Sequence, residues 1–282
     1  MSAESRTINQ DNLSDAIELI NESSRGMSFE YHLDTFSFLS LSRYWNFSYD
    51  HSLIHYVDDE PAALILNCVD PAAQDAFTFY WGAVQKFRSR RISLPFFEAS
   101  CKHLQQDGYV MLHGDAVRDR PVRRYRFLHA EPQRVMFQMQ AQSPQLPPRH
   151  LACEVRRIDV SELSRLTPPH GEPLHWCQRN TFLEHAAPLL QFLGAFSGDA
   201  LEAYAVLLPQ PSNTILLDLR SATTSFAAGY ELLRCLLGQD YRPPITATHV
   251  LDQTYAHRLL TAAKFHEKSQ SSTLSRNLRA LD

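Results

Sequence analysis

The segment FTFYWGAVQKFRSRRISLPFFEASCKHLQQDG, residues 77–108, decides the fold expected for this chain. It opens with an apolar, aromatic run that predicts a strand over residues 77–84, and it closes with a helix predicted over residues 92–106. The turn between them carries four cations: Lys86, Arg88, Arg90 and Arg91. Unpaired backbone N–H groups and the positive end of a helix dipole favour an anion, and the arginines add full charge. The segment therefore predicts a site for the phosphates of a nucleotide-like or coenzyme-like molecule.

The composition is that of a globular protein. The chain has 282 residues, of which 44% are hydrophobic and 21% are charged, and its length favours two domains. A net charge of −4 disfavours a general nucleic-acid binder, whose domain is normally basic. Ten of the 27 Lys and Arg residues nevertheless fall within residues 86–126, which predicts a local cationic face.

The five cysteines are scattered and form no CxxC pair, which indicates free thiols in a reducing compartment. The thirteen histidines show no HExxH spacing, so we expect no metal site. The first 15 residues are polar and resemble no secretory signal. Since no run of about 18 apolar residues occurs, we expect no membrane span and a cytoplasmic protein.

A proline-rich segment, AQSPQLPPRH at residues 141–150, predicts a linker near the middle of the chain. Before it we expect helices at residues 13–21, 33–41, 92–106 and 121–128, and strands at 52–57, 62–69, 77–84, 110–117 and 134–140. After it we expect strands at residues 189–196, 203–208, 214–219, 245–251 and 271–278, and helices at 226–237 and 255–263. The same order of elements returns, which predicts an internal duplication with domains at 1–140 and 151–282.

This order resembles the GNAT superfamily of N-acetyltransferases, twice in tandem. The resemblance implies an α/β fold with a mixed (α+β) sheet and two tandem acyl-CoA N-acyltransferase (GNAT-like) domains. In the family, the turn after the fourth strand reads Q/R-x-x-G-x-G/A and binds the pyrophosphate of acetyl-CoA. The residues that match it here are Arg88, Ser89, Arg90, Arg91, Ile92 and Ser93. Arg91 and Ser93 replace the two glycines, whose absence changes how closely the backbone can approach phosphate.

A second motif of the family, N-x-P-A-x-x-L-Y, is similar to DRPVRRY at residues 119–125. It places Asp119 at the first position and Tyr125 at the tyrosine that protonates the leaving CoA thiolate. The resemblance also implies that backbone N–H groups near Ala83 and Val84 polarise the thioester carbonyl. The base that deprotonates the acceptor amine stays open among four residues: Glu30, Asp34, Asp50 and His113.

The second half departs from both motifs. Its turn at residues 220–225 has one cation and no glycine, and Leu260 occupies the tyrosine position. We therefore expect this half not to bind acetyl-CoA productively and instead to wall the acceptor cleft. Side chains that could shape the acceptor pocket, or simply fill the core, lie in the aromatic-rich segment 29–49 and at His175, Trp176 and Gln178.

The resemblance implies an acetyl-CoA-dependent N-acetyltransferase with its active site in the first domain. The acceptor is expected to be a small-molecule or peptide amine, and the protein a monomer or homodimer that binds no membrane. Two alternatives stay open. The missing glycines favour a non-catalytic acyl-CoA-binding or regulatory protein, and paired GNAT-like domains also occur in aminoacyl-tRNA-dependent transferases.

Overall fold

The protein is described by a computed structural model that covers residues 2–27, 30–117, 131–141, 143–148, 153–166, 174–238 and 244–281. It divides into two compact units, residues 1–133 together with 273–282, and residues 134–272. The expected boundaries were 1–140, 141–150 and 151–282. The observed units differ from these because the strand around residue 135 belongs to the second unit and the last ten residues belong to the first.

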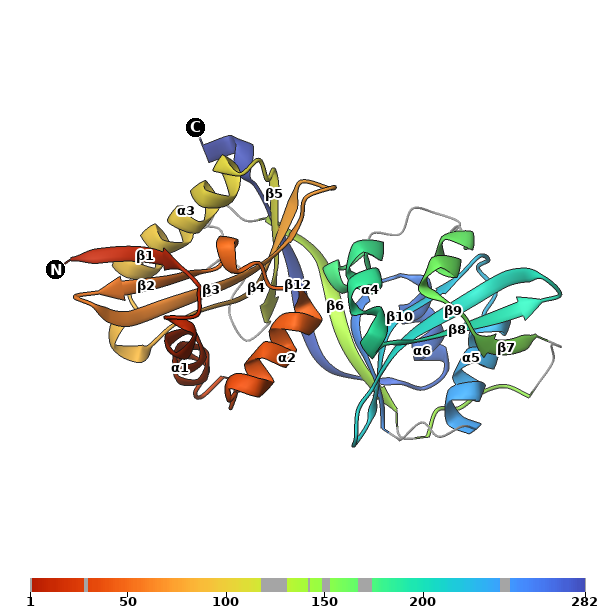
Figure 1. Ribbon diagram of the computed structural model, residues 1–282. Helices are drawn as coiled ribbons and strands as arrows, with labels where there is room; N and C mark the ends of the chain where they lie inside the picture. The colour runs from red at the N-terminus through yellow and green to blue at the C-terminus, as the bar shows by residue number, and fades with distance from the viewer. Residues whose placement is uncertain are drawn as a thin grey trace. The chain divides into compact units, whose positions relative to one another are not determined.

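The first unit is a mixed sheet with helices on both of its faces (Figure 1). Its strands β1 to β4 pair antiparallel in chain order, and β5 then adds parallel to β4. The elements in chain order are β1 (Ala3–Thr7), α1 (Leu13–Ser23), α2 (Thr35–Trp45), β2 (Leu53–Val57), β3 (Glu60–Asp70), β4 (Asp75–Ala83), α3 (Arg90–Gln106) and β5 (Met111–Val117).

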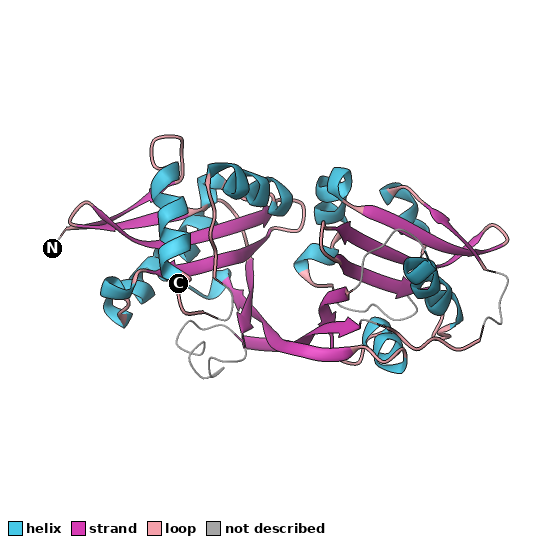
Figure 2. Ribbon diagram, turned by 90° about the horizontal axis from the view of Figure 1, so that it is seen from below, coloured by secondary structure: helices cyan, strands magenta, loops and turns pink. Residues whose placement is uncertain are grey.

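The second unit repeats this plan (Figure 2). Strands β7 to β10 pair antiparallel and β11 adds parallel to β10. Its elements are β6 (Glu131–Ala141), β7 (Glu154–Arg157), α4 (Asn180–Ala186), β8 (Gln191–Ser197), β9 (Ala200–Pro209), β10 (Thr214–Ser221), α5 (Ala227–Gly238), β11 (Ile245–Leu251), α6 (Tyr255–Ala262) and the first part of β12 (His266–Asn277).

The sequence predicted most of these elements, and the misses have physical reasons. All five residues of β1 are exposed, so this strand shows no alternation of apolar and polar side chains. The short strand β7 and the seven-residue helix α4 offer too few residues for a period to show. The expected helix at residues 121–128 lies outside the described residues.

The last strand of each sheet comes from the other half of the sequence. We expected residues 134–140 to close the first sheet, and this is wrong: β6 pairs antiparallel with β11, from Ile245 opposite Ala141 to Leu251 opposite Met136. The end of β12 instead lies beside β5 in the first unit, where the N–H of Leu278 donates to the carbonyl of Val110 at 2.8 Å. Each sheet is therefore completed by a strand from the other half of the sequence.

Each unit has its own apolar core. In the first, α3 buries Phe96, Cys101 and Leu104 against the sheet, and Leu274 and Leu278 join them from the end of the chain. In the second, α5 and α6 cover the sheet with a core that includes the following buried residues: Leu232, Leu233, Leu236, Leu259, Leu260, Phe137 and Met139. Burial of this kind contributes roughly 25 cal/mol per Å² of apolar surface.

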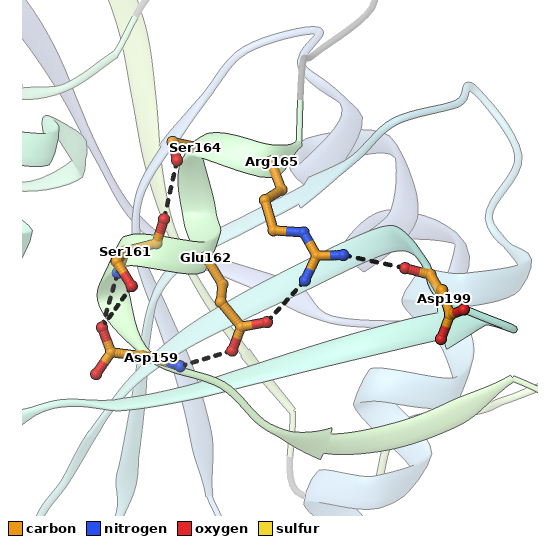
Figure 3. A network of polar contacts seen from close by, with 6 residues as sticks. All are labelled: Asp159, Ser161, Glu162, Ser164, Arg165 and Asp199. Atoms are coloured by element: carbon orange, nitrogen blue, oxygen red, sulfur yellow. Dashed lines mark hydrogen bonds and ion pairs between the residues drawn. The ribbon is translucent and has the colours of Figure 1, made fainter.

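The segment around residues 159–165 of the second unit is held by a network of local polar contacts (Figure 3). Asp159 caps the 3₁₀ helix η5 (Val160–Arg165) by accepting the N–H of Ser161 at 2.9 Å, and Glu162 reaches back to the N–H of Asp159 at 3.2 Å. The bonds that Asp159 accepts from the backbone N–H and the hydroxyl of Ser161 lower the pKa of its carboxyl. Arg165 then binds Glu162 at 3.0 Å and the carbonyl of Asp199 at 3.1 Å, which ties η5 to the turn after β8.

The proline-rich segment at 141–150 runs along the second unit over its described residues 143–148. The N–H of Gln145 donates to the carbonyl of Ala263 at 2.9 Å, and Arg234 donates to the carbonyl of Pro147 at 2.7 Å. Within the described part of the chain, no helix is both long and apolar enough to cross a bilayer.

Candidate active site

The sheet of the first unit opens into a fork between β4 and β5. The two strands pair only from Asp75 with Met111 to Thr78 with Gly114, although β4 continues to Ala83 and β5 to Val117. Beyond Thr78, the edge of β4 that faces β5 has no ladder partner on that strand. A fork of this kind leaves backbone N–H groups directed into the space between two strands.

Ala83 and Val84 lie at the end of β4 and direct their N–H groups to opposite sides. The N–H of Val84 donates to the carbonyl of Ala62 on β3 at 3.0 Å, so it points away from the fork. Ala83 lies opposite Ala63, and because antiparallel partners alternate, its N–H and carbonyl point away from β3 toward the fork. Of the two residues, Ala83 is therefore the one whose amide can meet a carbonyl oxygen bound there.

The turn that follows leads into the start of α3. Ser89 is the N-cap residue, and its side chain makes no capping hydrogen bond. Its carbonyl accepts the N–H groups of Ile92 at 3.2 Å and Ser93 at 2.9 Å. Arg90 and Arg91 are the first two residues of α3, so their N–H groups precede the first i to i−4 hydrogen bonds of the helix.

Two of the four turn cations have partners within the first unit. The guanidinium of Arg88 donates to the carbonyl of Ser23 at 2.7 Å and to that of Ala83 at 3.2 Å, which ties the turn to the end of α1. Lys86 forms an ion pair with Glu60 on the surface. Arg91 is exposed. The expected pyrophosphate motif thus contains an arginine that positions the turn as well as residues open to an anion.

Asp119 and Tyr125, the expected motif residue and expected proton donor, both lie outside the described residues. Their roles stay predictions.

Three polar side chains form a chain across β4, β5 and β12, within the paired segment that precedes the fork. His113 Nε2 lies 3.2 Å from Oδ2 of Asp75, and His113 Nδ1 lies 2.9 Å from Oγ of Ser275. All three are partly buried. A carboxylate on one imidazole nitrogen and a hydroxyl on the other is the arrangement in which histidine removes a proton from the hydroxyl. Sequence analysis named His113 as one of four candidate bases. It did not indicate Ser275, which lies on β12.

The carboxylates of Asp34 and Glu30 are engaged elsewhere, and the contact recorded for Asp50 is through its backbone carbonyl. Asp34 caps α2 by accepting the N–H of Ser37 at 2.7 Å, which lowers the pKa of its carboxyl. Glu30 accepts the N–H of Gly26 at 2.6 Å. Asp50 uses its carbonyl to bind His103 at 2.7 Å. Of these candidates, His113 has the geometry of a base.

Aromatic side chains from the segment 29–49 pack on the same region of β4. Trp45 of α2 stacks on Phe77, with ring centroids 6.0 Å apart and an angle of 9° between the rings. The ring centroid of Phe79 lies 4.9 Å from that of Trp45 and 4.9 Å from that of Phe47. Phe77 lies opposite His113 in the parallel pairing, so the aromatic cluster and the polar chain adjoin. This segment therefore provides an apolar wall beside the fork.

In the second unit, the strands that correspond to β4 and β5 are β10 and β11, and the polar residues of β10 there bind one another. Asp218 is buried and accepts hydrogen bonds from Arg220 Nε at 2.9 Å and from the Tyr204 hydroxyl at 3.0 Å. Burial raises the pKa of Asp218 despite these partners. The one cation of this turn is thus committed to an internal pair, and Leu260, at the expected tyrosine position, is fully buried in the core.

Comparison with solved structures identifies the fold. The chain superposes over its whole length on a tandem GNAT protein from the clavulanic acid biosynthesis pathway, with a TM-score of 0.66, 10% identity and coverage of 100% of both chains. It is also similar to an acetyltransferase of Pyrococcus horikoshii (TM-score 0.65, 12% identity, 98% of this chain and 89% of that one). A third similar structure is the N-myristoyltransferase of Saccharomyces cerevisiae with bound myristoyl-CoA (TM-score 0.65, 12% identity, 98% and 79%).

The fold is therefore that of the GNAT N-acyltransferases in its tandem form, as the sequence predicted. No family model matches the chain. No curated protein is similar to it in sequence. The similarity thus lies in backbone architecture.

Proposed function

We propose that the protein is an acetyl-CoA-dependent N-acetyltransferase that acts on a small-molecule or peptide amine in its first unit. The observation that carries this proposal is the chain Asp75–His113–Ser275 beside the fork of a GNAT fold. The second unit is proposed to have no productive donor site, because Arg220 is paired internally and Leu260 is buried.

The residues of the turn fit an acyl-CoA donor. The amides of Arg90 and Arg91 at the start of α3 would bind the diphosphate, with the guanidinium of Arg91 adding charge. The side chains at positions 91 and 93 make the cradle wider than one built on glycine. The donor supplies an activated thioester carbonyl, and the amide of Ala83 would stabilise the negative charge that develops on its oxygen.

The polar chain would remove the proton that the amine loses as it attacks. Ser275 is the member of the chain farthest from Asp75, and its hydroxyl would pass its own proton to Nδ1 of His113 and take one from the amine. Asp75 holds the Nε2 proton and stabilises the imidazolium that forms. Tyr125 is proposed to return a proton to the leaving sulfur, as the resemblance implies.

The test measures CoA release from acetyl-CoA by chromatography over a panel of amines. Wild type is expected to turn over at least one amine. Ser275→Ala, His113→Gln and Tyr125→Phe are each expected to lower kcat by about 10²-fold or more, the usual contribution of a positioned acid or base. Ser269→Ala is the matched control, because Ser269 lies on the same strand and binds Gln138 rather than His113.

Calorimetry with acetyl-CoA separates this proposal from the non-catalytic alternative. Binding with no turnover of any amine would favour an acyl-CoA-binding protein. If the protein showed no binding of acetyl-CoA and no turnover, both interpretations of the turn would be wrong.

A further inference from the structure

A second cluster of reactive side chains lies in the second unit, apart from the proposed transferase site. Cys177 is fully buried, and its Sγ lies 3.1 Å from Nδ1 of His175 and 3.4 Å from Nδ1 of His249. The two imidazole rings are stacked, with centroids 4.1 Å apart and an angle of 12° between them. His175 is also buried, whereas His249 is partly exposed.

The positions of the three side chains are fixed by the backbone around them. His175 caps the 3₁₀ helix η6 (Trp176–Gln178), and its N–H donates to Oε1 of Gln178 at 3.1 Å. Gln178 in turn donates to the carbonyl of Leu217 at 3.1 Å, which anchors η6 on β10. His249 has a φ of 56° and lies where the pairing of β11 with β6 shifts register. A left-handed backbone at a non-glycine residue is a cost of the kind found at functional sites.

The cluster is close enough to hold a metal ion, but the rings are not oriented for one. Imidazoles that share a tetrahedral ion place it in both ring planes, at about 2.0–2.1 Å from each nitrogen. Two rings stacked at 12° have nearly parallel planes that do not meet at a common ion. The arrangement instead suits hydrogen bonds between a single sulfur and one nitrogen of each imidazole.

The hydrogen bonds place the protons. The backbone N–H of Cys177 donates to Nδ1 of His175 at 3.3 Å, so that nitrogen is an acceptor and carries no proton. The nitrogen left to hold a proton against the sulfur is Nδ1 of His249. Burial by itself would raise the pKa of the Cys177 thiol, but its interactions with His249, and then with His175, outweigh burial and lower the pKa from 9.0 to about 6.

Other charged groups near η6 have partners of their own. Asp218 and Arg220 of β10 form a pair at 2.9 Å, and the guanidinium of Arg179 lies over the ring of Trp176 at 5.0 Å. The imidazoles are therefore the groups that set the charge at the Cys177 sulfur.

The remaining cysteines provide internal controls. Burial raises the pKa of Cys68, Cys101, Cys153 and Cys235. Cys235 is the least buried of the five and Cys177 is fully buried. Reactivity governed by exposure would thus favour Cys235, and reactivity governed by thiolate content would favour Cys177.

Burial restricts what can reach this sulfur. Cys177 is 0% exposed, so a reactant must be small enough to pass between packed side chains, which excludes a CoA thioester. A cavity of about 20 Å³, lined in part by Gln178 of η6, lies nearby, but Cys177, His175 and His249 do not line it. This volume holds about one water-sized molecule.

We propose that Cys177 is a site of oxidation by hydrogen peroxide, with His249 as the proton donor. The thiolate sulfur attacks one peroxide oxygen, so that an S–O bond forms and the O–O bond breaks. Sulfur loses two electrons and becomes a sulfenic acid, while the peroxide is reduced. The departing hydroxide takes the Nδ1 proton of His249 and leaves as water.

The test treats the full-length protein with limiting hydrogen peroxide at neutral pH, traps sulfenic acid with dimedone and locates it by peptide mass spectrometry. A thiol with a pKa near 6 is about 90% ionised at neutral pH, against about 1% for one near 9. We expect at least about tenfold more label on Cys177 than on Cys235. His249→Asn, which suits the left-handed backbone, is expected to reduce the Cys177 label about tenfold, whereas His257→Asn leaves it unchanged.

A second measurement does not depend on the access of peroxide to the sulfur. The ultraviolet absorbance of the thiolate, followed against pH in wild type and in Cys177→Ser, should show an inflection near pH 6 that the variant lacks. The proposal is overturned by label that falls first on Cys235, by the absence of that inflection, or by stoichiometric zinc in the purified protein that Cys177→Ser loses.

Discussion

Arg276 shows how a single residue can connect the end of the chain to the first unit. Its side chain is 3% exposed and makes two bonds to Glu98 of α3, at 2.8 and 2.9 Å. Glu98 is 28% exposed, so water can still reach its carboxylate. Removal of Glu98 would therefore leave a buried guanidinium, whereas removal of Arg276 would leave a carboxylate that water can reach.

We expect Glu98→Ala to lower the free energy of unfolding by about 3 kcal/mol, because it leaves a buried guanidinium without its partner. Arg276→Met should cost less, about 1–2 kcal/mol, since the carboxylate left behind remains hydrated. Urea unfolding of the two variants measures both values. An equal or reversed order would contradict this reading of the pair.

Arg88 illustrates the limit of prediction for a single residue. The sequence shows a cation at the position of the pyrophosphate motif, yet the guanidinium binds two backbone carbonyls. Charge is visible in a sequence, but the direction of a long side chain depends on which carbonyls the fold leaves unpaired nearby.

At the level of elements, α3 contains a proline in its interior, where proline disfavours a helix. Pro95 is the sixth helical residue and lacks an N–H, so the carbonyl of Arg91 has no helical donor at that position. The first turn, which holds the proposed diphosphate amides, is therefore separated from the rest of α3 by a missing bond.

Pro95→Ala should restore that bond and raise the free energy of unfolding by about 1–3 kcal/mol. Pro71→Ala, in the turn between β3 and β4, is the matched control. It should have the opposite sign and lower stability by up to about 1 kcal/mol, because it frees the unfolded chain. Denaturant midpoints distinguish the two, and a loss of stability in Pro95→Ala would refute the account of α3.

At the level of the whole molecule, the exchange of closing strands makes the first unit depend on the last residues of the chain. Residues 273–282 supply Leu274, Arg276 and Leu278 to the first unit. The first half of the sequence alone cannot complete its own sheet.

Deletion of residues 273–282 should therefore unfold the first unit and leave the second folded. Trp45 and Trp81 report on the first unit and Trp176 on the second, so tryptophan fluorescence of variants that keep one of these residues would follow each unit. Deletion of residues 279–282 alone, which keeps Leu278, is the control and should leave both folded. A folded first unit in the longer deletion would disprove its dependence on β12.

The sequence by itself determined the elements, their order and the tandem GNAT architecture. Strands, helices and their ends are encoded in local periodicity and turn residues, and nearly every expected strand in the described part of the chain formed. Only the tertiary structure decided which strand completes which sheet, because a strand's pattern states that it needs a partner but not which one. For the same reason, the meeting of Ser275 with His113, 162 residues apart, and of Cys177 with His249, 72 residues apart, arose from folding alone.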